Sequence, residues 1–143
     1  MKINNILILL FILFAFSCKN EKNDERTKAI EYLQNVAKST NIISKLPRKI
    51  DEYTIAEKVI YESGKSMITY SYILTDITPY VENKSEVINS LKKIEINQIE
   101  KAQKNQGKDK AYQLLKVTIN SIYKDSKGKE FYSFKIKPEQ YIK

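Results

Sequence analysis

One side chain stands out as a chemical group in this sequence, the single cysteine, Cys18. It lies where an apolar run ends, at 14–17, and a polar segment begins, at Lys19. A lone cysteine cannot form a disulfide within the chain. The sequence also contains no histidine, so a cysteine nucleophile would lack its usual base, and Ser-His-Asp triads and ordinary zinc sites are excluded. We therefore expect Cys18 to be an attachment point, or a free redox thiol if it is not acylated.

Carboxylates are the remaining groups that could catalyse a reaction, because a pair of them can act as acid and base. Asp51, Glu57 and Asp76 flank the first predicted hairpin, but no spacing rule singles them out. Ser66 follows Lys65, and neighbours on a strand point to opposite faces, which disfavours a serine–lysine pair. The sequence has neither a phosphate-binding loop nor a calcium-loop motif. We therefore predict no catalytic residues, no metal site and no cofactor, and that the protein is not an enzyme.

The chain of 143 residues has a formal net charge of +8, carried almost entirely by lysine. Arginine, whose planar side chain suits bidentate phosphate binding, occurs only at Arg26 and Arg48. We therefore expect a solvated basic surface and no nucleic-acid partner. Lysine-mediated binding of an anionic polymer or lipid is an alternative.

The N-terminus has the layout of a secretory signal. Lys2 provides a positive charge, the run 3–16 is apolar except for Asn4 and Asn5, and Ser17 is small. This run is too short for a transmembrane helix, which needs about 20 apolar residues. We therefore predict that the protein is exported.

The end of that run, Ala15-Phe16-Ser17-Cys18, resembles the lipoprotein box of bacterial lipoproteins. Those proteins usually have an aliphatic residue three positions before the cysteine and a small residue two before, and Ala15 and Phe16 depart from that pattern. The resemblance implies cleavage before Cys18 and acylation of that residue, which anchors stably when two or more chains insert. The alternative is an ordinary secretory signal, or a short anchor, with Cys18 incidental.

The same resemblance divides the chain into a signal peptide (1–17), a lipidated cysteine with a flexible tether (18–23) and one domain (24–143). Lys19 stands where an aspartate retains enteric lipoproteins in the inner membrane. The resemblance therefore implies the outer membrane, with the domain facing either the periplasm or the outside.

The mature part is predicted to alternate helices and hairpins. Apolar residues at helical spacing predict helices over about 24–40 and 84–106. In the first helix they are Ala29, Ile30, Leu33, Val36 and Ala37. Alternating patterns predict hairpins over 53–74 and about 112–137. The order helix–hairpin–helix–hairpin predicts an α+β two-layer domain, in which a four-stranded antiparallel sheet carries both helices on one face. The apolar stripe of the second helix is expected to consist of Val87, Ile88, Leu91, Ile94, Ile99 and Ala102.

The register of the first hairpin decides which side chains share a face. A two-residue turn at 63–64 places Glu57 opposite Tyr70 and Ile55 opposite Tyr72. Glu57 would then interrupt an apolar row, and burial would raise the pKa of its carboxyl. The alternative is that Glu57 lies at the rim and accepts a hydrogen bond from Tyr70 or water.

Two registers are open for the second hairpin. A four-residue loop sets Ile119 opposite Phe134 and produces one apolar face, whereas a three-residue loop sets Ile119 opposite Lys135. The pattern favours the first.

Four short segments, Leu46-Pro47, Ile50-Asp51, Thr54 and Tyr70-Ser71-Tyr72, together resemble a pattern of small, uncharacterised exported bacterial proteins. The resemblance covers about 30–143 and implies a fold rather than an activity. It draws attention to Asp51 and Thr54, although Asp51 also suits a turn, where its side chain accepts from nearby backbone N–H groups. The candidate binding or structural residues are Asp51, Thr54, Glu57, Tyr70 and Tyr72.

These features together favour a lipid-anchored envelope lipoprotein that acts as a non-catalytic protein-interaction module. Its partners would be the membrane, through the acyl chains, and an envelope protein, for instance as an immunity or inhibitor protein. The main alternative is an envelope enzyme that uses carboxylates, for example in glycan hydrolysis.

Overall fold

A computed structural model of the chain describes the backbone of residues 3–105 and 110–142, and the side chains of 22–100 and 110–142. Its α+β class is as predicted. The predicted helix end at 106 lies outside the described residues. The elements, in chain order, are α1 (Ile3–Ile43), β1 (Arg48–Lys49), β2 (Thr54–Glu62), β3 (Met67–Leu74), α2 (Thr78–Val81), α3 (Lys84–Asn105), α4 (Lys110–Leu114), β4 (Thr118–Lys124) and β5 (Glu130–Ile136), with short 3₁₀ turns at Ser63–Lys65 and Pro138–Gln140.

The strands form one mixed sheet in the order β1-β2-β3-β4-β5. Neighbouring strands are antiparallel except for β3 and β4, which are parallel. The prediction of four antiparallel strands is therefore wrong in two respects, because β1 adds a strand and the two hairpins join in parallel. The physical reason is the long connection over 75–117, whose helices α2, α3 and α4 carry the chain back across the sheet, as a parallel pair requires.

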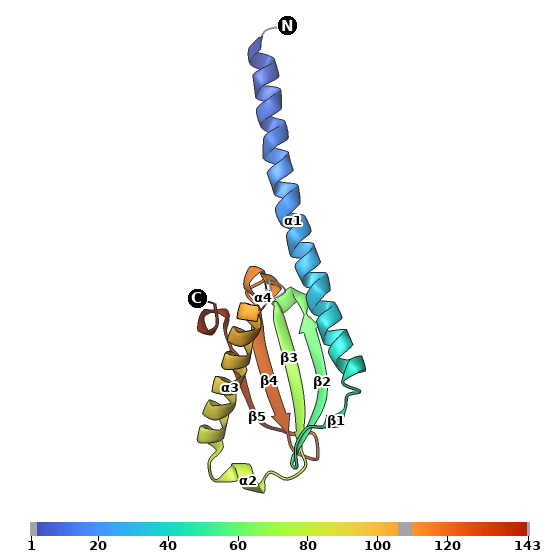
Figure 1. The fold of residues 1–143 in the computed structure, drawn as a ribbon, viewed down its shortest axis with the longest axis vertical. Helices are drawn as coiled ribbons and strands as arrows, with labels where there is room; N and C mark the ends of the chain where they lie inside the picture. Colours follow the sequence, from blue (N-terminus) through green and yellow to red (C-terminus); the bar gives the residue numbers. More distant parts are fainter. Residues whose placement is uncertain (1–2, 106–109, 143) are drawn as a thin grey trace.

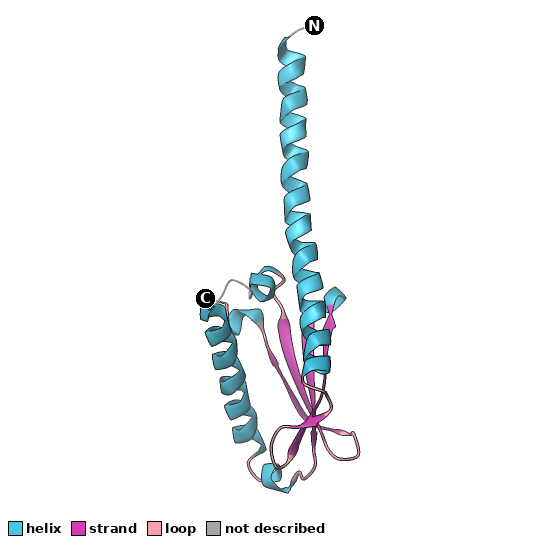
Figure 2. Ribbon diagram, turned by 45° about the vertical axis from the view of Figure 1, so that its right-hand side comes forward, coloured by secondary structure: helices cyan, strands magenta, loops and turns pink. Residues whose placement is uncertain are grey.

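Both long helices, α1 and α3, lie against the same face of the sheet (Figure 1, Figure 2). We call this the helix-covered face. The row Ala29, Leu33 and Ala37 of α1 is buried in its core, at the helical spacing that the sequence predicts. The buried apolar side chains of the strands all point to it: Val59, Ile68, Leu74, Ile119, Tyr123, Tyr132, Phe134 and Ile136.

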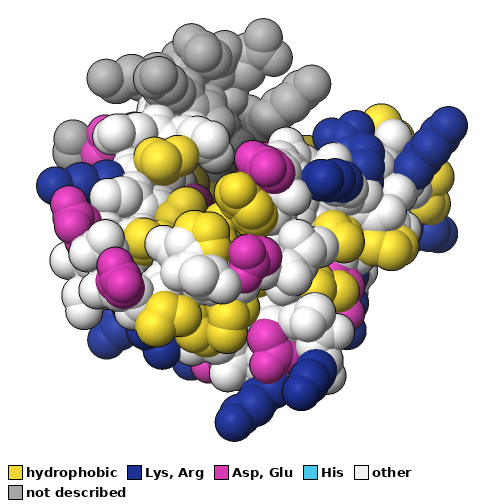
Figure 3. Space-filling model, turned by 90° about the horizontal axis from the view of Figure 1, so that it is seen from below, with side chains coloured by type: hydrophobic (Ala, Val, Ile, Leu, Met, Phe, Trp, Pro, Cys, Tyr) yellow, Lys and Arg dark blue, Asp and Glu magenta, His cyan; other side chains and the backbone are white. Residues whose placement is uncertain are grey.

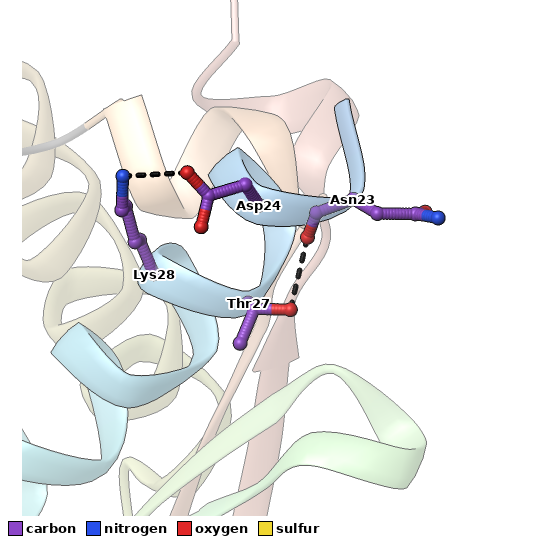
Figure 4. A network of polar contacts seen from close by, with 4 residues as sticks. All are labelled: Asn23, Asp24, Thr27 and Lys28. Carbon is purple, nitrogen blue, oxygen red and sulfur yellow. Dashed lines mark hydrogen bonds and ion pairs between the residues drawn. The ribbon is translucent and has the colours of Figure 1, made fainter. Parts of the chain in front are cut away.

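In the full-length chain, α1 passes without a break through 18–23, where a flexible tether is expected. Its first described side chains make local contacts typical of an exposed helix (Figure 4). Lys28 and Asp24 form an ion pair of 2.6 Å, and the Thr27 hydroxyl donates to the Asn23 carbonyl oxygen. Among the described residues, no helix combines the length and apolar character needed to cross a membrane. The division into signal peptide, tether and domain stays a prediction.

The loops set hairpin registers that differ from the predicted ones. In the first hairpin, the turn includes Ser66 with a φ of 44°, so Glu62 faces Met67 and the predicted two-residue turn at 63–64 is wrong. A β-bulge then lies between Ala56 and Lys58, which face Tyr72 and Ser71. Because a bulge leaves one residue unpaired, the predicted pairing of Glu57 with Tyr70 is also wrong.

The second hairpin is shifted by two residues from the favoured register. Ile119 faces Ile136, and Phe134 faces Ser121. A shift of two keeps every side chain on the same face, so the predicted apolar face is present although the predicted pairs are not. The strand also starts later than predicted, at Thr118, because α4 occupies 110–114.

The end of α1 is held to the sheet by Asn41. Its amide nitrogen donates to the carbonyl oxygen of Val59, and its amide oxygen accepts from the N–H of Val59, both at 2.8 Å. The short strand β1 pairs only with Ile55 and Ala56 of β2, so it does not reach Val59. Asn41 thus supplies the two hydrogen bonds that a neighbouring strand would supply.

We predict that Asn41→Asp lowers the free energy of unfolding by about 1–3 kcal/mol, because a carboxylate cannot donate to the Val59 carbonyl. Chemical denaturation measures the change. Gln34→Glu on the exposed side of α1 adds the same charge and is expected to stay within about 0.5 kcal/mol of the parent. Equal losses in the two variants would contradict this role of Asn41.

Candidate functional site

A cavity of about 230 Å³ lies between α3 and the helix-covered face, and we call it the tyrosine cavity. Its walls combine tyrosines, apolar side chains and two carboxylates. They come from the loop before β2, from β2 to β5, and from α2 and α3. The lining residues are Ile50, Asp51, Thr54, Tyr72, Leu74, Tyr80, Val87, Leu91, Ile94, Glu95, Gln98, Tyr123 and Tyr132.

The helix α3 contributes the innermost carboxylate, Glu95. Glu95 lies four residues after Leu91 and four before Ile99, so all three share one face of the helix. That face, rather than one centred on Ile94, packs against the sheet: Ile94 is 52% exposed, while Ile96 contacts the core. The predicted stripe is therefore confirmed at Val87, Ile88, Leu91 and Ile99 and wrong at Ile94, whose place Ile96 takes. The side chain of Ala102 lies outside the described residues. The carboxylate within the stripe was missed. Its position at the i+4 spacing between Leu91 and Ile99 was the signal in the sequence.

Ser121 of β4 is the direct partner of Glu95. Its hydroxyl donates to the two carboxylate oxygens, with Oγ at 2.8 Å from Oε1 and 3.0 Å from Oε2. Ser121 is fully buried. The ion pairs found among the described residues do not include Glu95. The carboxyl is therefore held by a neutral donor and lacks a balancing positive charge.

Burial raises the pKa of Glu95 to about 7, and the hydrogen bond from Ser121 lowers it only in part. The groups that face it from the surrounding elements are Asp51, Tyr80 and the sheet tyrosines. Near neutral pH, Glu95 is thus present as a mixture of neutral acid and carboxylate.

Three tyrosines form a ladder across the sheet beneath this carboxyl. The register places Tyr72, Tyr123 and Tyr132 side by side on β3, β4 and β5. Their rings stack with centroids 4.6 Å apart in the first pair and 4.5 Å in the second. Burial raises the pKa of all three hydroxyls, so they stay protonated at physiological pH. The Tyr132 hydroxyl is buried and has no hydrogen-bond partner among the described residues.

Three of the five candidate residues from the sequence meet in this cavity: Asp51, Thr54 and Tyr72. Asp51 is exposed, so it stands at the mouth, and its Oδ1 accepts from the N–H of Tyr53 at 2.9 Å. This is the turn contact expected of it. Thr54 is buried, and its carbonyl oxygen accepts from the N–H of Ile50 at 2.9 Å. The two residues thus shape the loop that closes one side of the cavity.

The structure separates the other candidates from the cavity. Glu57 lies on the opposite face of the sheet because of the bulge, and its Oε2 is 2.7 Å from Nζ of Lys124. Its expected burial in an apolar row is therefore wrong. Tyr70 lines a second cavity, beneath the end of α1 and next to Leu46. The side chain of Cys18 lies outside the described residues, and its role stays a prediction.

The lining of the tyrosine cavity suits binding more directly than metal chemistry. Among the described residues, no group of three or more acidic or cysteine side chains is placed to hold a metal ion. The cavity offers hydroxyl groups, one titratable acid and apolar walls. Such a mixture orients a small ligand through a few polar contacts.

We predict that the free energy of unfolding falls by about 2–3 kcal/mol as the pH rises from 4.5 to 7. The folded state holds a proton on Glu95 in this range and the unfolded state does not, so raising the pH favours unfolding. Denaturation of Glu95→Gln and of Glu86→Gln, an exposed residue on the same helix, isolates the effect. The first variant should lose this slope and the second should keep it. The same slope in both would contradict the burial of Glu95.

No protein-family model matches the chain, and no curated protein is significantly similar to it in sequence. Its fold is similar to that of a candidate secreted protein from Pseudomonas aeruginosa, whose crystal structure was determined at 1.60 Å resolution. The TM-score is 0.59, and the match covers 83% of this chain and 95% of that one. The two sequences are 14% identical, so the similarity shows a shared fold and nothing about activity.

Proposed function

We propose that this protein is an exported lipoprotein, anchored through acyl chains on Cys18, whose domain binds a protein of the bacterial envelope. The anchor rests on the sequence, where the single cysteine follows an apolar leader. We expect the protein to be located in the outer membrane, because Lys19 rather than an aspartate follows the cysteine. The domain would act without catalysis.

The observation that carries the binding role is the face of the sheet opposite α1 and α3, which we call the uncovered face. No helix of the described chain packs against it. It presents isoleucines on three neighbouring strands, Ile60 on β2, Ile73 on β3 and Ile122 on β4. Ile60 is 44% exposed. Thr69, Ser71 and Asn120 lie between these isoleucines on the same face, so the face mixes apolar and polar groups, as protein-binding surfaces commonly do.

Charged groups border these isoleucines and would fix the orientation of a partner. Glu57 and Lys124 pair across β3 at 2.7 Å, and both side chains are about one-quarter exposed. Lys58 beside them is exposed. A docked protein would exclude water from this pair, which makes the contact sensitive to complementary charge.

An enzyme that uses carboxylates has weaker support. The expected trio is divided, since Glu57 lies on the uncovered face and Asp76 accepts from the N–H of Thr78 at the start of α2. Asp51 and Glu95 share the tyrosine cavity and are the pair that such an enzyme would have to use. The pairing of two acids in one cavity is also what a binding site for a cation requires.

The anchor predicts that cells supplied with radioactive palmitate label the wild-type protein and leave Cys18→Ala unlabelled. The thiol and the new amino group of the cysteine are the acceptors in lipoproteins, so the substitution removes both processing and attachment. Electrophoresis of the immunoprecipitated protein gives the result. Equal labelling of the two chains would refute the anchor.

The uncovered face predicts that Ile60→Glu reduces recovery of a specific envelope protein at least about fivefold, because it replaces an exposed apolar side chain of this face with a charge. Affinity capture from solubilised membranes, quantified by mass spectrometry, measures recovery. Asn89→Glu, an exposed residue on α3, introduces the same charge away from this face and should have no effect. Equal recovery by all three chains, or no specific partner, would count against the proposal.

A further inference from the structure

The Tyr132 hydroxyl is a buried polar group at the wall of the tyrosine cavity. Tyr132 is 4% exposed, and its hydroxyl lacks a hydrogen-bond partner among the described residues. A buried polar group without a partner costs about 1–3 kcal/mol. Because Tyr132 also lines the cavity, a ligand atom inside it could provide the absent hydrogen bond.

The charges around the cavity specify the sign of that ligand. Among the residues whose side chains the structure describes, no lysine or arginine lines this cavity, whereas Asp51 and Glu95 both do. Glu95 lies inside the cavity and Asp51 lies at its mouth, so a negatively charged group is present at both depths. Viewed from the end of the molecule that carries α2, acidic and hydrophobic side chains mix in the middle, and the basic ones stand mainly toward the margins (Figure 3). An anionic ligand would meet repulsion here.

The side chains that line the cavity indicate the size and polarity of the ligand. Leu74, Val87 and Leu91 provide apolar surface, which disfavours a hydrated metal ion and favours an organic group. The tyrosine rings stack on one another, so their faces are largely occupied. The ligand cation would therefore contact hydroxyl and carboxylate oxygens rather than ring faces. A volume of about 230 Å³ limits it to a small molecule or a single side chain.

We propose that the tyrosine cavity binds an organic ammonium group, either of a free small amine or of a lysine side chain. The ammonium would donate to the Glu95 carboxylate and to the Tyr132 hydroxyl oxygen, with Asp51 at the mouth adding attraction. The carbon chain would lie against the apolar wall. This site is separate from the uncovered face, so either proposal can fail without the other.

Binding of the ammonium requires the ionised form of Glu95. Affinity therefore rises with pH from 5 to about 7, as Glu95 loses its proton, and then levels off until the amine itself deprotonates. The other titratable groups around Glu95 are Asp51, Tyr80, Tyr70, Tyr72, Tyr123 and Tyr132. The raised pKa values of the three ladder tyrosines exclude them as the source of a change in this range.

The test titrates the full-length chain, held in a non-ionic detergent, with benzylamine, benzyl alcohol and benzoate at pH 8. These probes share one apolar body and differ in charge. Amide shifts in two-dimensional NMR give both the affinity and the place of binding. We expect benzylamine to bind at least about tenfold more tightly than the other two and to shift the amides of Glu95, Ser121 and Tyr132. Equal affinities, or no binding of benzylamine, would overturn the proposal.

Two variants and a pair of lysine analogues complete the test. Glu95→Gln should weaken benzylamine at least about tenfold and Tyr132→Phe by a smaller factor, while Glu86→Gln should have no effect. Unchanged affinity in Glu95→Gln would also overturn the proposal. N-acetyl-lysine amide, compared with its norleucine counterpart, separates the two sources. Tighter binding of the lysine compound than of benzylamine identifies a protein side chain as the natural ligand, and the reverse identifies a free amine.

Discussion

The parallel pairing of β3 with β4 is the constraint on which the rest of this structure depends. Two hairpins can pair their own strands locally, but a parallel junction requires the chain to return across the sheet. The return segment, 75–117, carries α3 over β4 and β5. The same junction aligns Tyr72 with Tyr123 and places Ser121 below α3. The cavity, its tyrosine ladder and its carboxylate all follow from that one pairing.

The interior polar groups of this domain are concentrated where α3 crosses the sheet. Glu95 is desolvated without a cation, and the Tyr132 hydroxyl is buried without a partner among the described residues. Each costs stability, and apolar side chains of similar size would remove that cost. By contrast, Asn41 at the end of α1 satisfies both backbone groups of Val59. The Tyr61 hydroxyl, outside the tyrosine cavity, is also buried without a partner among the described residues. Where two such groups share one cavity, as Glu95 and Tyr132 do, the departure from packing rules is characteristic of a functional site.

The features that were predicted correctly from the sequence are those that a local pattern of residues determines. The stripe Ala29, Leu33 and Ala37 and the apolar face of the second hairpin follow from helical and strand periodicity, and both are present. The registers failed because they depend on turn conformation: Ser66 adopts a left-handed φ that its residue type does not favour. The parallel pairing of β3 with β4 was not predicted, because no local sequence pattern encodes which strands of two hairpins pair with each other. Asp51, Thr54 and Tyr72 were found through a resemblance, whereas Glu95 was missed although its spacing from Leu91 and Ile99 places it on the packed side of α3.

Glu57 and Glu95 show that the topology of the sheet decides which carboxylate lies inside the domain. The predicted register placed Glu57 within an apolar row of a strand and left two interpretations open, burial with a raised pKa or a position at the rim with Tyr70 or water as partner. The bulge after Ala56 turned Glu57 to the uncovered face, where Lys124 neutralises it. The crossover helix α3 places Glu95 on the covered side, where the Ser121 hydroxyl is its hydrogen-bond partner among the described residues. Lys124 balances the charge of Glu57, whereas no ion pair among the described residues balances the charge of Glu95. The difference in partners, rather than in residue type, therefore makes Glu95 the position at which this fold is prepared for a positively charged ligand.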